Sequence, residues 1–486
     1  MYLGLDLGTS GLKALLLDEC HGVVAVATAP LDSARPSPGW SEQDPADWIA
    51  ACTQALHDLS DHLGSVKAIG IAGHMHGVVL LDAAGDVVRP CLLWNDTRAA
   101  AEAAAMDADP AFRAISGTIV FPGFSAPKMA WVRDQEPEHW TRTERVLFPK
   151  DFLAYWLTGR LNCEPSDAAG SALFDPGEGD WSPALCAAAG LSPDLLPPIL
   201  DSDSPRGPVR PEIAERFSLN PACVVAGGAG DNAAASLGIG AVGDGEGQVS
   251  LGTSGVLLTV NERWTPDADT AVHSFSHAAA GRYIQMGVTL TATDSLSWLA
   301  DLLETTPGAL SDALSDALQD EQSDGPGPVL FLPYLAGERT PHNLDQPAGG
   351  FFGLSRSHGP QAMTRAVMEG VAYSLADCAA ALTAAGARVE KLTAVGGGAR
   401  SRFWLQTLAD VLERPLTLNP QAEHAAALGG ARLAMAAASG RSVVDVIGAA
   451  PVPDDLETIQ PRPETFAAYR AALQRYRDLF NALREI

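Results

Sequence analysis

The stretch "YLGLDLGTSGLKALLLD" (Tyr2 to Asp18) repeats its centre half a chain later, in "GQVSLGTSGVLLTVN" (Gly247 to Asn261). In both places an apolar, strand-like segment leads into Leu-Gly-Thr-Ser-Gly, and a second strand-like segment follows. Solenoid repeats recur about every 20 to 50 residues, a far shorter period than this one. We therefore predict two related domains, at residues 1–242 and 243–486.

Composition predicts a cytoplasmic protein that binds neither nucleic acid nor membrane. The 486 residues carry a net charge of −27, which disfavours polyanions and anionic lipid surfaces. Seven cysteines, odd in number and without a CxxC pair, are typical of reduced thiols rather than of disulfides or a zinc site. The chain opens on a strand-like segment instead of a basic and apolar leader, and no apolar run is long enough to cross a bilayer.

Strand-like and helix-like segments alternate outside the two repeats. "VKAIGIAG" (66–73) has the apolar run of a buried strand, whereas "DPADWIAACTQALHDLSDHL" (44–63) has helical periodicity. A second helix, rich in small residues that allow close packing, is predicted at 363–385. This alternation predicts the α/β class, with sheets covered by helices on both sides.

The repeated turn has the composition of a phosphate-binding turn. Glycine, threonine and serine expose backbone amides and hydroxyls, which suit phosphate oxygens. One copy alone is typical of an ordinary hairpin turn, but two copies facing a cleft would hold one polyphosphate from both sides. A P-loop is excluded because it needs GxxxxGK[ST] leading into a helix. Asp6 directly precedes the first copy and is placed to hold Mg²⁺, or else to cap the turn.

A candidate catalytic carboxylate lies in "VVAGGAGDNAAAS" (224–236), where a glycine turn meets a helix. Asp231 and Asn232 are favoured residues for capping that helix, which is the purely structural interpretation. The preceding glycines leave the carboxylate uncrowded, and a helix N-terminus favours its ionised form. Phosphoryl transfer needs one carboxylate to accept the proton of the attacking hydroxyl, and Asp231 suits that role.

A third glycine cluster follows the strand-like start of "TAVGGGARSRFW" (393–404). Triple glycine between a strand and a helix allows backbone to approach a flat ligand, and the helix start offers free amides. The alternative is a tight connection without a ligand.

Together these segments resemble the FGGY family of carbohydrate kinases, within the actin/Hsp70/hexokinase-like ATPase fold. "FSAPKMAWV" (124–132) and "GFFGLSRSHGPQAMTRAVMEGVAYSL" (350–375) resemble the two signature regions of the family. "IAGHMHGVVLLD" (71–82) and "LLWNDTR" (92–98) resemble the members that phosphorylate D-xylulose. The resemblance implies two ribonuclease-H-like domains flanking a nucleotide- and sugar-binding cleft, with ATP and Mg²⁺ as cofactors and a homodimer as the assembly.

The resemblance also implies a role for each matching residue. Asp231 would be the general base and Asp6 the carboxylate that holds Mg²⁺, both beside the metal. Phosphate contacts are expected from Thr9, Ser10, Gly252 and Thr253, and adenosine contacts from Gly396, Gly397 and Gly398. Sugar contacts are expected from Met75, His76, Trp94, Asn95, Asp96 and Asn232, with Arg98, Glu338 and Arg339 as weaker candidates that buttress the cleft.

The expected reaction is ATP-dependent phosphorylation of D-xylulose to D-xylulose 5-phosphate. Two alternatives stay open from the sequence: a kinase of another pentulose or polyol, and a non-catalytic sugar-sensing relative. A departure from the family pattern bears on the first alternative, because His74 stands where relatives have glutamine. We expect a structural histidine with satisfied ring nitrogens there, the alternative being a direct sugar contact.

Overall fold

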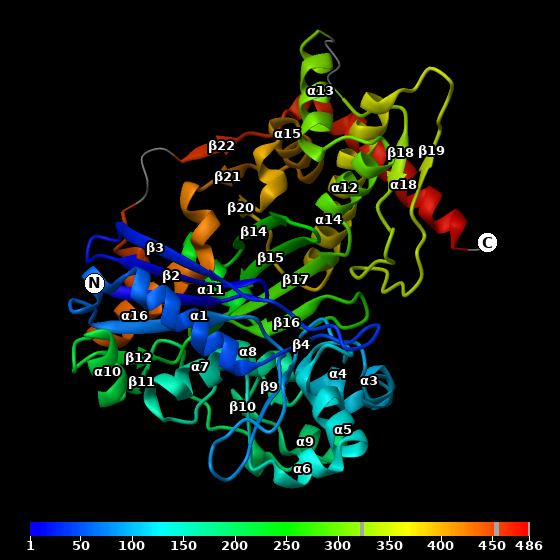
Figure 1. The fold of residues 1–486 in the computed structure, drawn as a ribbon. Helices are drawn as coiled ribbons and strands as arrows, with labels where there is room; N and C mark the ends of the chain where they lie inside the picture. Colours follow the sequence, from blue (N-terminus) through cyan, green and yellow to red (C-terminus); the bar gives the residue numbers. More distant parts are fainter. Residues whose placement is uncertain (321–324, 452–455, 485–486) are drawn as a thin grey trace.

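The computed structural model describes residues 1–320, 325–451 and 456–484, and it contains two large sheets (Figure 1). The strand order is β11-β12-β5-β1-β2-β3 in the first sheet and β16-β17-β15-β14-β20-β21-β22 in the second. The first sheet comprises β1 (Tyr2–Leu7), β2 (Gly11–Leu17), β3 (Val23–Pro30), β5 (Ala68–Gly73), β11 (Pro205–Pro208), β12 (Val224–Ala226) and β13 (Ala229–Gly230). The second comprises β14 (Glu246–Leu251), β15 (Gly255–Asn261), β16 (His273–Ser276), β17 (Tyr283–Thr289), β20 (Lys391–Val395), β21 (Leu416–Leu418) and β22 (Glu457–Ile459).

The two sheets have the same design. In the first, β1 is antiparallel to β2 and parallel to β5, and β5 is in turn parallel to β12. In the second, β14 is antiparallel to β15 and parallel to β20, and β20 is parallel to β21. Each Leu-Gly-Thr-Ser-Gly turn therefore joins equivalent strands of equivalent sheets. The predicted α/β fold with two related domains is confirmed.

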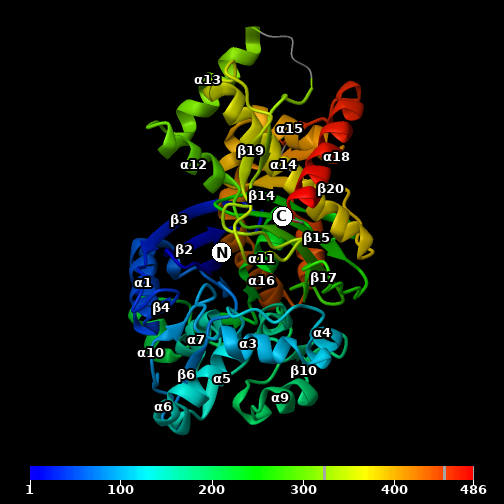
Figure 2. The same ribbon diagram turned by 90° about the vertical axis from the view of Figure 1, so that its right-hand side faces the viewer.

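Helices surround both sheets, and α3 to α6 and α9 gather at the end of the molecule opposite α13 (Figure 1, Figure 2). The helix expected at 44–63 is divided into two helices at Leu59, and the helix expected at 363–385 is confirmed. The helices of the first half are α1 (Pro45–Asp58), α2 (Ser60–Leu63), α3 (Ala100–Asp107), α4 (Pro110–Ser116), α5 (Ser125–Gln135), α6 (Pro137–Arg142), α7 (Pro149–Thr158), α8 (Pro165–Ala168), α9 (Pro183–Ala189), α10 (Pro211–Phe217) and α11 (Asp231–Ile239). Those of the second half are α12 (Thr293–Leu302), α13 (Pro307–Asp320), α14 (Pro360–Ala384), α15 (Arg402–Leu412), α16 (Ala425–Ser439), α17 (Val443–Gly448) and α18 (Phe466–Leu483).

Short elements complete the described chain. Short 3₁₀ helices are η1 (Ala169–Ser171), η2 (Pro193–Leu195), η3 (Gly397–Arg400), η4 (Pro420–His424) and η5 (Pro463–Thr465). Small two-stranded sheets pair β4 (Glu42–Gln43) with β7 (Cys91–Leu92), β6 (Val79–Leu81) with β8 (Arg145–Leu147), β9 (Phe174–Asp175) with β10 (Asp180–Trp181), and β18 (Leu330–Leu332) with β19 (Gly350–Phe352). In the part of the chain that the structure covers, no helix is both long and apolar enough to cross a membrane.

Helix α16 belongs to the second half of the chain but packs against the first sheet. It contacts β1, β5 and α11, and Figure 1 shows it beside the blue N-terminal strands. The approach is backbone to backbone: a Cβ added to Gly70 of β5 would lie 1.9 Å from the carbonyl oxygen of Gly430. A Cβ on Gly429 would likewise lie 1.9 Å from the carbonyl oxygen of Ala234 in α11. The boundary predicted between residues 242 and 243 stays a prediction, since these contacts cross it.

This packing predicts that Gly70→Ala destabilises the protein by at least about 3 kcal/mol, because the added methyl group must separate helix from sheet. The midpoint of urea unfolding measures the effect. Gly308→Ala in α13 is the matched control, since its new Cβ would meet nothing within 4 Å. Alanine has the higher helix propensity, so the control should be neutral or stabilising by up to about 1 kcal/mol. Equal midpoints for the two variants would contradict the tight contact.

Candidate active site

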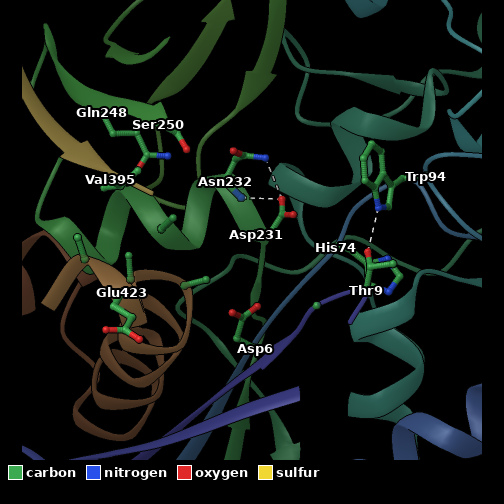
Figure 3. A pocket seen from close by; sticks show the side chains of 15 residues that line it. Asp6, Thr9, His74, Trp94, Asp231, Asn232, Gln248, Ser250, Val395 and Glu423 are labelled. Carbon is green, nitrogen blue, oxygen red and sulfur yellow. Dashed lines mark hydrogen bonds between the residues drawn. The ribbon is translucent and has the colours of Figure 1, made fainter. Parts of the chain in front are cut away.

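A cavity of about 400 Å³ opens between the two halves of the molecule (Figure 3). Its first wall comes from the end of β1, the turn after it, the end of β5 and the start of α11, and its second wall comes from β14, β20 and η4. The lining residues are Asp6, Gly8, Thr9, His74, Trp94, Asp231, Asn232, Ala235, Gln248, Ser250, Val395, Ala422, Glu423, Ala425 and Ala426. The structure therefore brings Asp6, Thr9, Trp94, Asp231 and Asn232 together, as the sequence predicts for one site.

Strand pairing explains why Asp6 and Asp231 meet although they are far apart in the sequence. Asp6 on β1 lies opposite Ala72 of β5, and Ala72 lies opposite Ala229 of β13 on its other side. The chain then turns from β13 directly into α11, so Asp231 is the first residue of that helix. Figure 3 shows both carboxylates in the same cavity.

The carboxyl groups of Asp6 and Asp231 both have raised pKa values. Burial, followed by repulsion from Asp231, raises the pKa of Asp6 to about 7, and Lys13 only partly opposes this rise. Burial also raises the pKa of Asp231 to about 6, although its carboxylate accepts hydrogen bonds from the amide nitrogen (2.7 Å) and Nδ2 (2.9 Å) of Asn232. No hydrogen-bond donor among the described residues contacts Asp6, so its charge is left for an incoming group.

In the first glycine turn, the carbonyl and the hydroxyl of Thr9 are hydrogen-bonded, whereas two backbone amides have no acceptor among the described residues. Gln43 donates to the backbone carbonyl of Thr9 (2.7 Å), and the indole nitrogen of Trp94 donates to the Thr9 hydroxyl (3.0 Å). The amides of Thr9 and Ser10 donate no hydrogen bond within the described protein. Free amides in a tight turn are the donors that a phosphate group requires.

The second turn has the same property. The carbonyls of Gly252 and Thr253 accept hydrogen bonds from the first residues of α12, at 2.9 Å from the amide of Thr293 and 2.8 Å from that of Ala292. The amides of Gly252 and Thr253 have no acceptor among the described residues. Both predicted phosphate turns therefore keep their amide donors unused, although Ser10, Gly252 and Thr253 lie outside the cavity lining.

The three consecutive glycines play different parts. A Cβ on Gly396 would lie 2.7 Å from the carbonyl oxygen of Leu251, and one on Gly398 would lie 2.7 Å from the Cβ of Leu251. These two glycines therefore let β20 turn tightly against β14. Gly397 faces open space, since its Cβ would meet nothing within 4 Å. They follow Val395, which lines the cavity, and the adenosine role of all three stays a prediction.

Met75 and His76 are not among the lining residues and lie between η1 and the loop that precedes Asp231. A Cβ on Gly230 would lie 2.8 Å from Cγ of Met75, so the Met75 side chain supports the loop that precedes Asp231. His76 has a left-handed backbone (φ 70°) and stacks on Phe124 at 4.6 Å. Its Nδ1 lies 2.6 Å from the carbonyl oxygen of Gly170 and must carry the proton to donate to it. Burial lowers the pKa of His76 to about 4, so the ring is neutral with Nε2 as an acceptor.

In the WNDTR segment, one residue lines the cavity and two others lie behind its wall. Trp94 is 48% exposed and lines the cavity, whereas Asp96 is fully buried. The Asp96 carboxylate accepts from the amide of Ser41 (2.6 Å) and binds the Arg98 guanidinium, whose carbon lies 3.7 Å from the Trp40 ring centre. The structure thus places Asp96 and Arg98 behind the wall, and Asn95 is likewise absent from the lining.

Glu338 and Arg339 also support the site rather than line it. The Glu338 carboxylate accepts hydrogen bonds from Thr289, Ser374 and the amide of Leu290. The Arg339 guanidinium lies 3.7 Å over the Phe121 ring and thereby ties the second half to the first. The buttressing expected of this pair fits these contacts.

The expectation that the ring of His74 is satisfied within the protein is wrong. Both ring nitrogens are buried without a partner among the described residues, and the ring lies edge-on to Trp48 at 5.8 Å. Burial lowers its pKa to about 3, so the ring is neutral. His74 lines the cavity beside Thr9, but a contact with sugar stays open.

Sequence reasoning missed Gln248, Ser250 and Glu423, which line the second wall of the cavity. A signal for one of them was present, because Ser250 directly precedes the second repeat as Asp6 directly precedes the first. Gln248 is 4% exposed, and its Oε1 has no partner among the described residues. No pattern in the sequence marks Glu423, which lies in η4 before α16.

The donor set fits a magnesium ion that also binds substrate phosphates. Mg²⁺ is commonly held by one or two protein carboxylates together with phosphate oxygens and water. Asp6 and Asp231 supply two carboxylates in one cavity, and a cation there would relieve the repulsion that raises the Asp6 pKa. Among the described residues, no group of three or more His, Cys, Asp or Glu side chains forms a complete metal site.

Comparison with known proteins identifies relatives over the whole chain. Residues 1–238 match the N-terminal domain of the FGGY family of carbohydrate kinases, and residues 247–438 match its C-terminal domain. The xylulose kinase of Escherichia coli (strain K12) is 42% identical over 99% of both chains, and that of Klebsiella pneumoniae is 46% identical over 89% of both. The crystal structure of a xyloylose kinase from Brucella ovis has 46% identity and a TM-score of 0.95, covering 100% of this chain and 99% of its own. The resemblance stated from the motifs is confirmed.

The raised pKa of Asp6 predicts a pH-dependent magnesium affinity, since only the ionised carboxylate binds the cation. Below pH 7 the affinity should fall about tenfold per pH unit, and above pH 7 it should level off. Asp231→Asn removes the negative charge that repels the Asp6 carboxylate. It should therefore lower the pH above which the magnesium affinity is constant. Titration of Mg²⁺ followed by tryptophan fluorescence measures both, because Trp94 lines the cavity.

Two variants check that the magnesium signal comes from this site. Asp6→Asn should abolish the pH-dependent binding, whereas Asp61→Asn, at an exposed position in α2, should leave it unchanged. An affinity independent of pH, or identical in Asp6→Asn, would refute the metal assignment.

Proposed function

The chain belongs to the FGGY family of carbohydrate kinases, and we propose that it transfers the γ-phosphoryl group of ATP to D-xylulose, forming D-xylulose 5-phosphate. Relatives named xylulose kinase that match nearly the whole chain support this substrate. The observation that carries the proposal is the placement of Asp231, at the start of α11, in the same cavity as Asp6 and the first glycine turn.

The two turns hold the nucleotide phosphates in this proposal. The unused amides of Thr9 and Ser10 act from one side and those of Gly252 and Thr253 from the other. The adenosine lies along Gly396, Gly397 and Gly398, where the absence of side chains lets the ligand approach the backbone. Backbone amides suit an enzyme of net charge −27, since they supply positive dipoles without basic side chains.

The sugar binds on the side of the first domain. Nε2 of His76 accepts a hydrogen bond from a sugar hydroxyl, because Nδ1 is already committed to the carbonyl of Gly170. Asn232 holds Asp231 and lies beside the reacting hydroxyl, and the half-exposed ring of Trp94 covers the sugar. Met75, Asn95 and Asp96 shape this pocket from behind.

Asp231 is the general base of the reaction. Its ionised carboxylate accepts the proton of the terminal sugar hydroxyl as that oxygen forms a bond to the γ-phosphorus. The bond from the γ-phosphorus to the bridging oxygen breaks, and the electron pair leaves with ADP. When bound, Mg²⁺ neutralises the phosphate charge, and Asp6 would hold it with Asp231 close by. A cytoplasmic location and a homodimer stay predictions of the sequence.

The direct test is sugar-dependent ADP release with MgATP and a panel of D-xylulose, D-ribulose, L-ribulose, L-xylulose, glycerol and gluconate, plus a control without sugar. We expect a kcat/KM for D-xylulose at least tenfold above that for every other compound. A preference for another sugar would retain the kinase and reassign its pocket, with His74 as the first residue to exchange. Release that ignores every sugar would refute the kinase proposal, and no nucleotide turnover would favour a sensor.

Asp231→Asn tests the base, because asparagine has the same shape but accepts no proton. The kcat should fall by roughly 10²- to 10⁴-fold while ATP binding, measured by calorimetry, is retained. In the parent protein at saturating MgATP, kcat/KM for the sugar should fall below about pH 6, where Asp231 becomes protonated and cannot act as a base. Unchanged turnover in the variant, or activity constant down to pH 5, would contradict the assignment.

A further inference from the structure

A cluster of five charged side chains lies in the interior of the first domain, directly behind the loop that carries Asp231. Its members are Lys150, Asp151, Glu164, Asp167 and Arg206, whose charged groups are essentially excluded from solvent. Nζ of Lys150 lies 2.8 Å from Asp151, 3.4 Å from Glu164 and 3.3 Å from Asp167. Burying five ionisable groups is costly, and the proposed chemistry uses none of them.

Arg206 of the cluster and the neighbouring Ser166 form hydrogen bonds with the two ends of the loop 227–230. At one end, the Arg206 guanidinium donates to the carbonyl of Gly227 (2.8 Å) and to Asp151 (2.6 Å). At the other end, the amide of Gly230 donates to the hydroxyl of Ser166 (3.0 Å). Gly230 is the last residue before Asp231, so the hydrogen bond to Ser166 acts one residue from the carboxylate of the base.

Glu164 connects Ser166 to the charges. Its carboxylate accepts from the hydroxyl of Ser166 (2.8 Å), from the amides of Ser166 and Asp167 at the start of α8, and from the hydroxyl of Ser202 (2.8 Å). The Ser166 hydroxyl donates its proton to Glu164 and therefore presents a lone pair to the amide of Gly230. Glu164 thus fixes the direction of the Ser166 hydroxyl.

The aliphatic part of the Lys150 side chain packs against the end of β5 and against the loop 227–230. A Cβ on Gly73, at the end of β5, would lie 2.9 Å from Cβ of Lys150, and one on Gly228 would lie 3.6 Å from its Cδ. Burial lowers the pKa of Lys150, but Asp151, Asp167 and Glu164 outweigh this effect and keep the pKa above its usual range. Lys150 is therefore a permanent cation under the end of β5 and the base loop.

The same network also extends to His76, the residue that is proposed to bind a sugar hydroxyl. Helix α8 continues into η1, where the carbonyl of Gly170 accepts the hydrogen bond from Nδ1 of His76 (2.6 Å). Movement of α8 would thus displace both the base loop and the ring of His76.

We propose that Ser166, oriented by Glu164 and the Lys150 cluster, is a positioning residue that sets where the Asp231 carboxylate meets the sugar hydroxyl. The proposal rests on the proposed function for its kinetic consequence, but the rigidity of the loop can be measured without any substrate. Misplacement of a reacting group by about 1 Å costs roughly a hundredfold in rate.

The test compares Ser166→Ala with two matched serine controls. Ser202→Ala removes a hydrogen bond to the same Glu164 but leaves the acceptor of Gly230 in place. Ser236→Ala removes a fully buried hydroxyl that has no partner among the described residues, from the same helix as Asp231. Ser166→Thr keeps the hydroxyl and serves as the rescue variant.

We expect kcat of Ser166→Ala to fall roughly 10- to 100-fold while KM for MgATP stays within about twofold, since the nucleotide contacts lie on other turns. Hydrogen exchange of the substrate-free protein, read on a peptide spanning residues 224–236, should accelerate in Ser166→Ala alone. Both controls should match the parent protein, and Ser166→Thr should recover at least half of the lost kcat.

The outcomes separate the two proposals. Unchanged exchange in a folded Ser166→Ala, a kcat equal to that of the controls, or KM for MgATP rising in parallel would overturn the positioning role. A parent protein that phosphorylates no sugar would instead overturn the proposed function, and the exchange measurement would still decide whether Ser166 holds the loop. If Ser166→Ala does not fold, Ser166→Cys takes its place, because its thiol is a weaker acceptor for the amide of Gly230. Slower turnover with faster exchange in Ser166→Cys supports the proposal, and parent-like behaviour overturns it.

Discussion

The site depends on the approach of helix α16 to the first sheet and to helix α11 at distances that only glycine permits. Gly70 of β5 faces the backbone of Gly430 in α16, and Gly429 of the same helix faces the backbone of Ala234 in α11. These contacts fix α11 against α16, and α16 against β1 and β5. Because Asp231 begins α11 and Asp6 lies on β1, the separation of the two carboxylates follows from backbone contact rather than from side-chain packing, which allows little adjustment.

Electrostatics then prepares this rigid geometry for a polyphosphate and a cation. Asp6 and Asp231 share one cavity with Glu423, and no basic side chain among the described residues bonds to either aspartate. Burial raises their pKa values to about 7 and about 6. In the proposed function, the unused amides of both turns supply the positive dipoles that face the phosphates. The buried cations Lys150 and Arg206 lie behind the cavity wall, where they neutralise carboxylates that support the loop 227–230. The ionic groups that support the site are thereby separated from those that react.

The sequence predicted the parts whose chemistry is local. The repeated turn, Asp6 and the glycine-flanked Asp231 could be read from short motifs, and the turns occupy equivalent places in equivalent sheets. Contacts between distant segments could not be predicted this way: nothing in the sequence of α16 shows that it packs on the first sheet. The family resemblance placed Asp96 in the sugar pocket, but its buried carboxylate is bound by Arg98, two residues on. Burial decides such cases, and a charged motif does not reveal whether it is buried.

The duplicated scaffold carries a different residue directly before each copy of the turn. Asp6 directly precedes the first turn, whereas Ser250 directly precedes the second, and both line the cavity. A carboxylate in that place would join those of Asp6, Asp231 and Glu423 in the lining and would repel the phosphates that the two turns are proposed to bind, in a protein already at a net charge of −27. Serine retains a polar group without charge. In the proposed function the two turns thus hold phosphate alike, while Asp6 and Asp231 belong to the first half, on the side where the sugar acceptor must lose its proton.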